Sequence, residues 1–509
     1  MILMKHGLLT WGEDTRESYH RTIALVTKAE RYLSKKSGNP LKIKTSAPLS
    51  KARRRYLKAA PILRGLLAIP TNDPDRPYAR FILRPLITKE ILNFLDLSKG
   101  REAASTPPLT ADHLIRTKPY PMWVEGIKFD DEKKSREQIR KAITKYSKEY
   151  EEYFKRYSRK KPLNVDRFDS MPRVILIPGL GAICAGKYAK EADIARDITA
   201  STLSAKMRIS SMGRYEGLSE KHLFDMEYCS GQHAKLDKKD EFPLRRSVAI
   251  VTGAAGAIGS GICEELLKNG CHVAVTDLPG DNLVSLVNEF REKYKERVIG
   301  VSFDVTDPKS VSKGFDEVIE AWGGIDLVVV NAGIASVSSL TDMDTNTFRK
   351  LEKVNAEGTL NFLSESGRHF KVQGTGGDII VISTKNVFAP GAKFGAYSAT
   401  KAAAHQLARI ASLEFADMDV RVNMVSPDAV FSHGKRKSGL WAEVGPDRMK
   451  ARGLSGKELE EYYKNRNLLK AKVTAEHVAR AVVFFATRQT PTTGATIPVD
   501  GGLPDSTPR

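Results

Sequence analysis

The chain has 509 residues, 41% of them hydrophobic and 28% charged, which predicts several domains with sizeable cores and excludes a disordered protein. No apolar run reaches the length of a membrane span, and the first residues lack a basic leader followed by a long apolar stretch, so we expect a cytoplasmic protein with no membrane partner. The four cysteines show no paired metal spacing, which fits thiols in a reducing compartment.

The net charge of +20 is unevenly placed. Residues 1–246 hold 50 Lys and Arg against 30 Asp and Glu, a net of +20, whereas residues 247–509 hold 31 of each. A basic half can attract nucleic acid, phosphorylated metabolites or an acidic partner, but a solvated surface is the interpretation we favour. No zinc-finger, RNA-binding or helix-turn-helix signature is present, so we expect no nucleic-acid partner.

The first half combines predicted helices with a buried strand. Helical spacing of apolar residues runs over Glu13 to Leu33 and over Glu132 to Tyr157, where a stripe of tyrosines predicts a packing face. Residues 34–60 are basic and interrupted by proline, which predicts a surface segment. A buried strand is expected at Arg173 to Pro178, and a helix at Tyr188 to Ile209.

A glycine-rich segment lies between that strand and that helix. Gly181 to Lys187 fits the GxxxxGK pattern of a phosphate-binding loop, but Tyr188 stands where Ser or Thr would bind magnesium. No obvious acidic strand end for the metal follows. We therefore predict a strand-to-helix turn that packs two elements closely.

From Val248 onward, strands and helices alternate regularly. The apolar strands are expected at Val248–Val251, His272–Thr276, Val298–Phe303, Ile325–Val330, Ile379–Ile382 and Val420–Val425. This alternation predicts an α/β fold with a doubly wound parallel sheet.

A run of small residues, Thr252 to Gly259, follows the first of these strands and opens a helix. Small side chains let the backbone bend and approach a pyrophosphate, whose charge the helix N-terminus favours. The candidate cofactor-binding residues of this loop are Gly253, Ala255, Gly256, Ala257, Ile258 and Gly259.

Acidic residues at the next two strand ends support a dinucleotide site. Asp277 ends the second strand, where a carboxylate can bind the adenosine ribose hydroxyls and would repel a 2′-phosphate, which favours NAD over NADP. Asp304 ends the third strand and is a candidate contact to the adenine, and Val305 after it is a further candidate cofactor-binding residue. Each acid alone could equally cap its strand end, but together with the loop they predict bound NAD.

Tyr397 and Lys401 form a Tyr-x-x-x-Lys pair on a predicted helix, so both side chains can reach one site. Free tyrosine has a pKa near ~10, which a nearby ammonium lowers by stabilising the phenolate. Such a tyrosine can exchange a proton with an alcohol or carbonyl oxygen while hydride moves to or from a nicotinamide. Ser383 and Thr384, which end the preceding strand, offer hydroxyls to hold that oxygen. A surface pair is the alternative, and the position after a strand argues against it.

Residues 247–502 together resemble the short-chain dehydrogenase/reductase family. The further marks are Asn331-Ala332-Gly333 after the fourth strand, Asn355 in the following helix and the ending Thr493 to Gly502. The resemblance implies that Tyr397 is the acid/base, that Lys401 lowers its pKa and binds ribose, and that Asn355 holds a proton-relay water. It also implies that Asn331, Ala332 and Gly333 line the cofactor site.

Three positions depart from the family pattern. Ala257 stands where the middle glycine of the loop is expected. Thr384, thirteen residues before Tyr397, stands where the catalytic serine is expected, and the adjacent Ser383 should point to the other face of the strand. Asp428 replaces the glycine of the usual Pro-Gly after the sixth strand. None of these changes removes a required chemical group, so we expect catalysis.

The first half resembles part of a class II sugar-phosphate aldolase. The similar segments are His6 to Gly12, Leu109 to Pro119, Pro172 to Lys187 and Phe224 to Tyr228. With the second half, this resembles the bifunctional aldolase/short-chain dehydrogenase proteins of the rhamnulose-phosphate aldolase/alcohol dehydrogenase type, which implies a role in carbohydrate metabolism.

That resemblance implies a zinc site of three histidines, of which only His6 is matched. A catalytic zinc needs about three protein ligands, so we expect no metal site here, with His6 as a vestigial ligand of a truncated aldolase domain. A split gene, a frameshift or a wrongly chosen start would each account for the truncation.

We therefore predict an aldolase remnant over 1–35, a basic α/β connecting region over 36–240 and a Rossmann-type dehydrogenase domain over 245–509. The predicted function is an NAD-dependent oxidoreductase acting on a small hydroxyaldehyde, sugar alcohol or sugar phosphate, and we expect a homo-oligomer. Residues 431–472 are the expected substrate lid, in which Lys435, Arg436 and Lys437 either bind a phosphate or are simply solvated. The alternatives are a partial aldolase subunit completed by a separate chain and a basic interaction module fused to a dehydrogenase.

Overall fold

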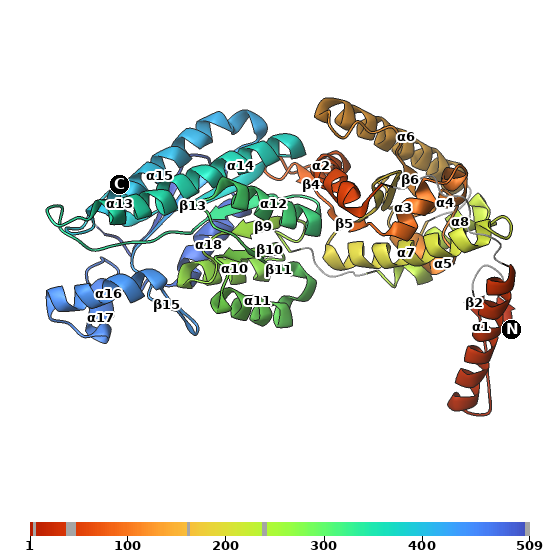
Figure 1. The fold of residues 1–509 in the computed structure, drawn as a ribbon, viewed down its shortest axis with the longest axis horizontal. Helices are drawn as coiled ribbons and strands as arrows, with labels where there is room; N and C mark the ends of the chain where they lie inside the picture. The colour runs from red at the N-terminus through yellow and green to blue at the C-terminus, as the bar shows by residue number, and fades with distance from the viewer. Residues whose placement is uncertain (4–6, 37–46, 160–162, 237–241, 504–509) are drawn as a thin grey trace. The chain divides into compact units, whose positions relative to one another are not determined.

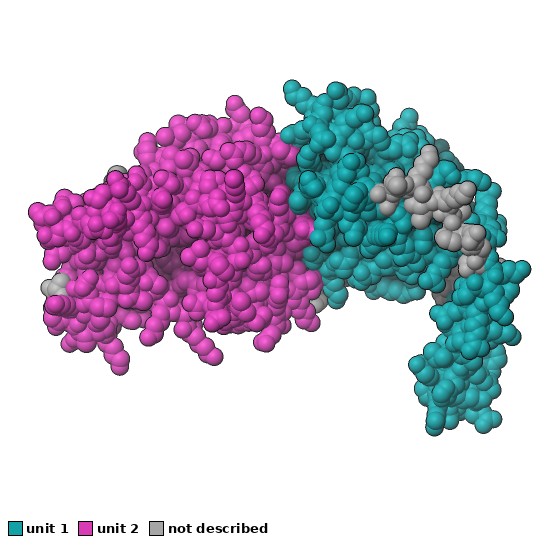
Figure 2. Space-filling view, viewed as in Figure 1, with its two compact units in different colours: residues 1–67, 81–240 teal, residues 68–80, 241–509 magenta. Residues whose placement is uncertain are grey.

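The computed structural model describes residues 1–3, 7–36, 47–159, 163–236 and 242–503. These form two compact units (Figures 1 and 2). Unit 1 comprises Met1–Leu67 and Phe81–Asp240, and unit 2 comprises Ala68–Arg80 and Glu241–Arg509. The sequence predicts a boundary near residue 240, and the assignment of 68–80 to unit 2 is the feature that it does not predict.

Unit 2 is built on a seven-stranded sheet in which every neighbouring pair of strands is parallel. Its order is β11-β10-β9-β12-β13-β14-β17. The strands are β9 (Val248–Val251), β10 (His272–Asp277), β11 (Val298–Ser302), β12 (Leu327–Val330), β13 (Gly377–Ile382), β14 (Val420–Pro427) and β17 (Thr496–Val499). The first six agree with the predicted strands. The predicted doubly wound parallel sheet is therefore confirmed.

Helices cover both faces of this sheet, as a parallel sheet requires (Figure 1). One face carries α10 (Ala257–Lys268), α11 (Asp281–Tyr294) and α18 (Ala475–Ala486). The other carries α12 (Pro308–Trp322), α14 (Gly358–Gln373) and α15 (Gly395–Glu414). Between β12 and α14 lie α13 (Thr345–Leu351) and a π-helical turn, η2 (Glu352–Glu357). Short 3-10 turns occur at Lys295–Arg297, Lys385–Val387 and Ala416–Met418.

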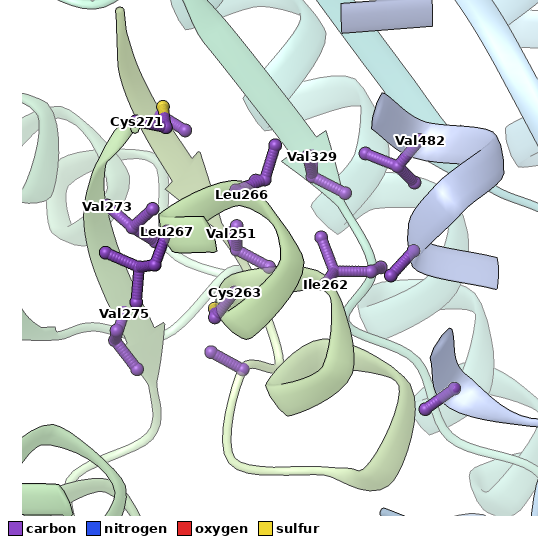
Figure 3. Close-up of a cluster of buried hydrophobic side chains, with 14 of the residues drawn as sticks. Val251, Ile262, Cys263, Leu266, Leu267, Cys271, Val273, Val275, Val329 and Val482 are labelled. Atoms are coloured by element: carbon purple, nitrogen blue, oxygen red, sulfur yellow. The ribbon is translucent and has the colours of Figure 1, made fainter. Parts of the chain in front are cut away.

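The core of unit 2 begins directly under the small-residue loop. Figure 3 shows Ile262, Cys263 and Leu266 of α10 around Val251 of the sheet, with Ile262 on the side of Val482 of α18. On the other side α10 packs against α18, where Gly261 lies so close to Ala475 that an added Cβ would come within 2.6 Å of the alanine methyl. This contact fixes the helix that opens at the loop.

The segment 68–80 adds a small hairpin to unit 2, β3 (Ile69–Pro70) paired with β4 (Tyr78–Ala79). Ion pairs attach it to the starts of the parallel strands. Arg80 pairs with the buried Asp326 at 3.2 Å, and Asp75 pairs with Arg421 at 3.1 Å. Nearby, the buried Arg488 guanidinium binds Asp378 and Asp419, each at 2.9 Å.

Unit 1 contains a four-stranded sheet of order β5-β8-β7-β6. These strands are β5 (Ile82–Leu86), β6 (Met122–Trp123), β7 (Val174–Ile177) and β8 (Gly181–Gly186), and a two-stranded pair, β1 (Ile2–Leu3) and β2 (Gly7–Leu8), precedes them. Its helices are α1 (Thr15–Lys36), α2 (Leu49–Leu67), α3 (Lys89–Leu95), α4 (Gly100–Ala104), α5 (Ala111–Thr117), α6 (Glu132–Ser158), α7 (Ala189–Ser210), α8 (Glu220–Glu227) and α9 (Ser230–His233).

Several predictions for unit 1 are confirmed and two are wrong. The stripe on α6 is a packing face, since Tyr146, Tyr150 and Tyr153 are buried. The GxxxxGK segment is not a strand-to-helix turn, because Gly181–Gly186 forms the buried strand β8, antiparallel to β7. Residues 49–60 are not a surface segment, because they belong to α2, which buries Ala52, Tyr56 and Ala59. The subdivision of this half at residue 35 stays a prediction.

None of the helices that the structure describes is long and apolar enough to cross a membrane.

Replacing Arg488 by Met should destabilise unit 2, because it leaves the carboxylate of Asp378 buried and unpaired. Breaking such a pair costs about 3–5 kcal/mol of the free energy of unfolding, which urea denaturation measures. Burial already raises the pKa of Asp378. A raised native pKa means that the folded carboxyl holds its proton at a pH where the unfolded one has lost it, so the deficit should shrink as the pH is lowered. The matched control is Arg368→Met, which removes an exposed pair with Glu365 and should change little.

Candidate active site

A cavity of about 870 Å³ lies at the carboxyl ends of the parallel strands of unit 2. The loops after β9, β12, β13 and β14 line it, and so does the lid, residues 431–472. In the sheet, β10 and β11 lie on one side of β9, and the chain then crosses to β12 on the other side of β9. The cavity therefore lies at the point where the strand order reverses. Doubly wound sheets bind their ligands in this crevice.

The loops after β9 and β12 are tied together at its floor. The Thr252 hydroxyl accepts hydrogen bonds from the backbone N–H groups of Asn331 and Ala332, both at 2.9 Å. The Asn331 amide donates in return to the carbonyl oxygens of Thr252 at 2.9 Å and Gly253 at 3.0 Å. Asn331 thus holds the shape of the small-residue loop as well as lining the cavity.

Glycine occurs at three positions of this loop for different physical reasons. Gly253 has φ +60°, and a Cβ on Gly259 would lie 2.2 Å from the Gly253 carbonyl oxygen. Gly256 is the N-cap of α10, and a Cβ there would meet only that same oxygen, at 3.5 Å. Ala257 is 2% exposed and belongs to the hydrophobic core, so its methyl group is accommodated. Ile258 is packed against that core and also lines the cavity.

Asp277 lies beside the loop at the end of β10. Its carboxylate accepts hydrogen bonds from the N–H groups of Ala255 at 2.9 Å and Leu278 at 2.8 Å. In the segments 276–283 and 303–305 that line this end of the cavity, the charged residues are Asp277, Asp281 and Asp304. Asp304 also caps its strand, since it accepts from Thr306 N at 2.8 Å, and Val305 follows it on the lining.

Tyr397 and Lys401 are buried on one face of α15, and both line the cavity. Burial raises the pKa of the Tyr397 hydroxyl, and a hydrogen bond with Thr384 opposes that change. Burial lowers the pKa of Lys401 to about 8. The Lys401 ammonium donates to the carbonyl oxygen of Ile382 at 3.1 Å. The pair is therefore largely buried at the wall of the cavity.

Adjacent residues at the end of β13 turn to different partners. The Ser383 hydroxyl is 2.9 Å from Nδ1 of the buried His405, whereas the Thr384 hydroxyl is hydrogen-bonded to Tyr397. The alternation of side chains along an extended strand produces this split. Of the two hydroxyls, the one beside Tyr397 is that of Thr384.

Asn355 lies in the π-helical turn η2 and is fully buried. Its amide oxygen accepts from Ile334 N at 3.0 Å, and its amide nitrogen donates to Ile334 O at 2.9 Å and to the Thr400 hydroxyl at 3.0 Å. A Cβ on Gly333 would lie 3.0 Å from the Lys401 nitrogen and 3.2 Å from the Asn355 amide oxygen. A side chain at this position would therefore be in tight contact where these two side chains converge.

The lid contains a two-stranded hairpin, β15 (Ser432–His433) with β16 (Arg436–Lys437), and two helices, α16 (Gly439–Arg452) and α17 (Gly456–Asn465) (Figure 1). Of its three consecutive basic residues, Lys437 lines the cavity, Arg436 pairs with Glu289 at 2.9 Å, and Lys435 is exposed. Asp428 forms an ion pair with Arg466 of the lid.

Sequence reasoning missed four cations that line this side of the cavity: Lys385, Arg448, Arg452 and Arg466. The i, i+4 spacing of Arg448 and Arg452 on one helix was the available signal, although such spacing is common on solvated helices.

These residues fit a nicotinamide dinucleotide. Gly256 leaves the helix N-terminus open to a pyrophosphate, since no atom lies within 3.4 Å of an added Cβ there. Asp277, Lys401 and Tyr397 lie along the same cavity. His6 lies outside the described residues. Within the described ranges, no group of three or more His, Cys, Asp or Glu residues is gathered where it could hold a metal ion.

Family models match both parts of the chain. The short chain dehydrogenase model matches residues 247–442, and the model of the second domain of class II aldolases matches residues 54–236.

Curated relatives match the whole chain or its second half. An uncharacterized oxidoreductase, YuxG, of Bacillus subtilis strain 168 is 30% identical over 99% of this chain and 72% of its own length. The L-2,3-butanediol dehydrogenase of Corynebacterium glutamicum is 31% identical over 50% of this chain and 98% of its own. An L-rhamnose 1-dehydrogenase (NAD(P)(+)) of a Sphingomonas species, strain SKA58, is 27% identical over 51% and 97%.

Lys401→Met should make the protein more stable to heat at pH 7, because it removes a buried ammonium whose charged form the folded state disfavours. Below about pH 8 the lysine is charged in both the folded and the unfolded chain, so the penalty is complete. As the pH rises from about 8 toward ~10.5, the folded lysine loses its proton first and the advantage of the variant should disappear. Thermal unfolding across this pH range measures it.

Lys371→Met, at an exposed position of α14, is the control and should leave the unfolding midpoint unchanged at each pH. A Lys401→Met variant that is less stable at pH 7, by a margin independent of pH, would contradict the interpretation.

Proposed function

The chain belongs to the short-chain dehydrogenase/reductase family, in a form that carries an aldolase class II second domain before the dehydrogenase, and we propose that this oxidoreductase uses NAD to interconvert a secondary alcohol and a carbonyl. The observation that carries the proposal is the convergence of Tyr397, Lys401 and Thr384 on one cavity with a small-residue loop and Asp277. A nicotinamide bound in that cavity supplies the acceptor or donor of the hydride.

In this proposal the chain's own residues handle the substrate oxygen and its proton. The Thr384 hydroxyl holds the oxygen, and its hydrogen bond with Tyr397 keeps the two groups within reach of the same atom. During oxidation Tyr397 takes the proton from the alcohol, and during reduction it returns a proton to the carbonyl oxygen.

Lys401 is proposed to make the tyrosine a better base. Burial alone raises the pKa of Tyr397, so a phenolate needs a nearby positive charge. Lys401 lies one helical turn away, and its pKa of about 8 leaves it mostly protonated at neutral pH. Asn355 is proposed to support a proton path beside Lys401, because its amide oxygen and the lysine nitrogen converge at Gly333.

We propose that the substrate is a small polyol, hydroxyaldehyde or sugar derivative. The names of two relatives, a butanediol dehydrogenase and a rhamnose dehydrogenase, support a substrate with neighbouring hydroxyl groups.

The cofactor should be NAD rather than NADP. A 2′-phosphate would approach Asp277 in a region where Asp281 and Asp304 are the other charged lining residues. Asp277→Asn removes the charge and keeps the shape, so it should shift the ratio of affinities toward NADPH by about tenfold or more, since tenfold corresponds to only about 1.4 kcal/mol. Fluorescence titration with NADH and NADPH measures the ratio. Asp342→Asn, which lies outside the cavity lining, is the control. Tighter NADPH binding by the unmodified protein would refute the assignment.

Four variants test the catalytic group. Tyr397→Phe removes the proton donor and should lower turnover by about 10²–10⁴-fold while NAD binding stays nearly intact. Thr384→Val keeps the shape, deletes the hydroxyl and should also lower turnover, whereas Thr384→Ser should retain activity. Ser383→Ala should be mild, because that hydroxyl faces His405. The measurement is turnover on the best substrate from a panel of hydroxyaldehydes and polyols. An inactive Ser383→Ala beside an active Thr384→Val would reverse the two roles, and a fully active Tyr397→Phe would refute the mechanism.

A further inference from the structure

The lid side of the cavity carries an excess of positive charge. Lys385, Lys437, Arg448, Arg452 and Arg466 line it, whereas the acidic residues there are Asp428 and Glu443. Asp428 is already used, because it forms an ion pair with Arg466. Glu443 is exposed and forms no ion pair with a described residue. The charge on this side is therefore not neutralised by the protein.

Among these cations, Arg448 is stacked on an aromatic ring next to Tyr397. Its guanidinium lies over the ring of Phe394, 4.1 Å from the ring centre. The Phe394 ring is in turn 6.0 Å from the ring of Tyr397, centre to centre. The Arg448 Nε is buried and has no hydrogen-bond partner. No carboxylate among the described residues forms an ion pair with this guanidinium. The ring of Phe394 contacts both the guanidinium and the ring of Tyr397, the proposed proton donor.

Lys385 brings a second unpaired cation to the same place. It directly follows Thr384, and its ammonium donates to the carbonyl oxygen of Ala389 at 3.3 Å but to no described carboxylate. Burial lowers the pKa of Lys385 and the charges of Arg466 and Arg448 lower it further, while the carboxylates of Asp428 and Asp500 raise it. Arg448 is subject to the same effects, from burial and from Arg452 and Arg466. These cations repel one another, so a bound anion would relieve the repulsion.

We propose that Lys385 and Arg448 form an anion subsite that binds a phosphate monoester on the alcohol substrate. The proposal rests on the proposed function, since it places the anion beside the hydroxyls of Thr384 and Tyr397. Two unpaired cations match the charge of a phosphate monoester, which is close to two at neutral pH, better than the single charge of a carboxylate. The guanidinium also offers a planar fork of donors that suits phosphate oxygens.

The subsite explains why the arginine is stacked. A guanidinium held on an aromatic face keeps its N–H groups in a fixed plane, so little side-chain entropy is lost when an anion binds. Phe394 thereby serves two neighbours, because it packs between Arg448 and Tyr397. The anionic end of the substrate and its reacting carbon would be positioned by side chains that touch the same ring.

The first test compares matched substrates with NAD as the cofactor. sn-Glycerol 3-phosphate is paired with glycerol and D-sorbitol 6-phosphate with D-sorbitol, and lactate represents a carboxylate. The unmodified protein should show at least about tenfold higher kcat/KM for a phosphate ester than for its parent polyol. Arg448→Met and Lys385→Met should each raise KM for the ester by about 10- to 100-fold, the range expected for lost hydrogen bonds to a charged group. Their kcat, and their kinetics on the parent polyol, should change less than about twofold.

Lys435→Met is the matched control, since it removes an exposed lid cation that does not line the cavity. The proposal is overturned if the unmodified protein prefers the parent polyol or lactate. It is also overturned if Arg448→Met affects ester and polyol equally, which would indicate a role in folding or in the lid as a whole.

A binding measurement separates this proposal from the proposed function. Inorganic phosphate is titrated by calorimetry into the full chain saturated with NAD, so that the pyrophosphate region is already filled. Binding should be at least about tenfold weaker in Arg448→Met, retained in Lys435→Met, and retained in Tyr397→Phe. Phosphate binding that is unaffected by Arg448→Met overturns the subsite. A fully active Tyr397→Phe that still binds phosphate refutes the catalytic group and leaves the subsite standing.

Discussion

The hydrogen bonds between Thr252 and Asn331 are the constraint on which the cavity depends. A parallel sheet whose chain winds outward from its centre in both directions leaves two loops diverging from neighbouring strands, here β9 and β12. Their buried backbone groups need partners, and the Thr252 hydroxyl and the Asn331 amide supply them to both loops at once. With the loops tied, Gly253 takes its positive φ, and the chain after Asn331 brings Gly333 beside Lys401.

A buried charged side chain lies near each end of strand β13, and the two differ in whether a partner of opposite charge is present. At its start, Asp378 is buried and its pKa is raised by burial, but the ion pair with Arg488 offsets part of the cost of its charge. Beyond its other end, the ammonium of Lys401 is buried against a carbonyl oxygen with no carboxylate among the described residues to neutralise it. The second arrangement costs stability, and burial lowers the pKa of Lys401 to about 8. Uncompensated charge of this kind is typical of sites that perform chemistry, since its pKa is adjusted to the task rather than to the fold.

Much of the fold of unit 2 could be predicted because its central strands are continuous apolar runs buried on both faces. The sequence did not predict β17. This strand lies at the edge of the sheet and contains Pro498, which a central strand would not tolerate. In unit 1, the glycines of Gly181–Gly186 suggested a turn, but burial on both faces makes the segment a strand, β8, between two partners. The hairpin at 68–80 could not be predicted, because ion pairs with residues more than 240 positions away hold it on unit 2.

The candidate site divides in the same way between local and distant causes. The opposite orientations of Ser383 and Thr384 follow from the pleat of one strand, so the sequence predicts them. Arg448 belongs to the lid and Lys385 follows β13, so the fold of the lid brings both to the same cavity. The amino-acid composition could not predict this subsite. Residues 247–509 hold 31 charges of each sign, a balance that predicts no electrostatic preference. The structure separates those charges, with Asp277, Asp281 and Asp304 at one end of the cavity and an excess of cations on its lid side. The local separation matters more than the overall balance, because a molecule inside the cavity would interact with the side chains that line it, while solvent and salt screen the rest of the chain.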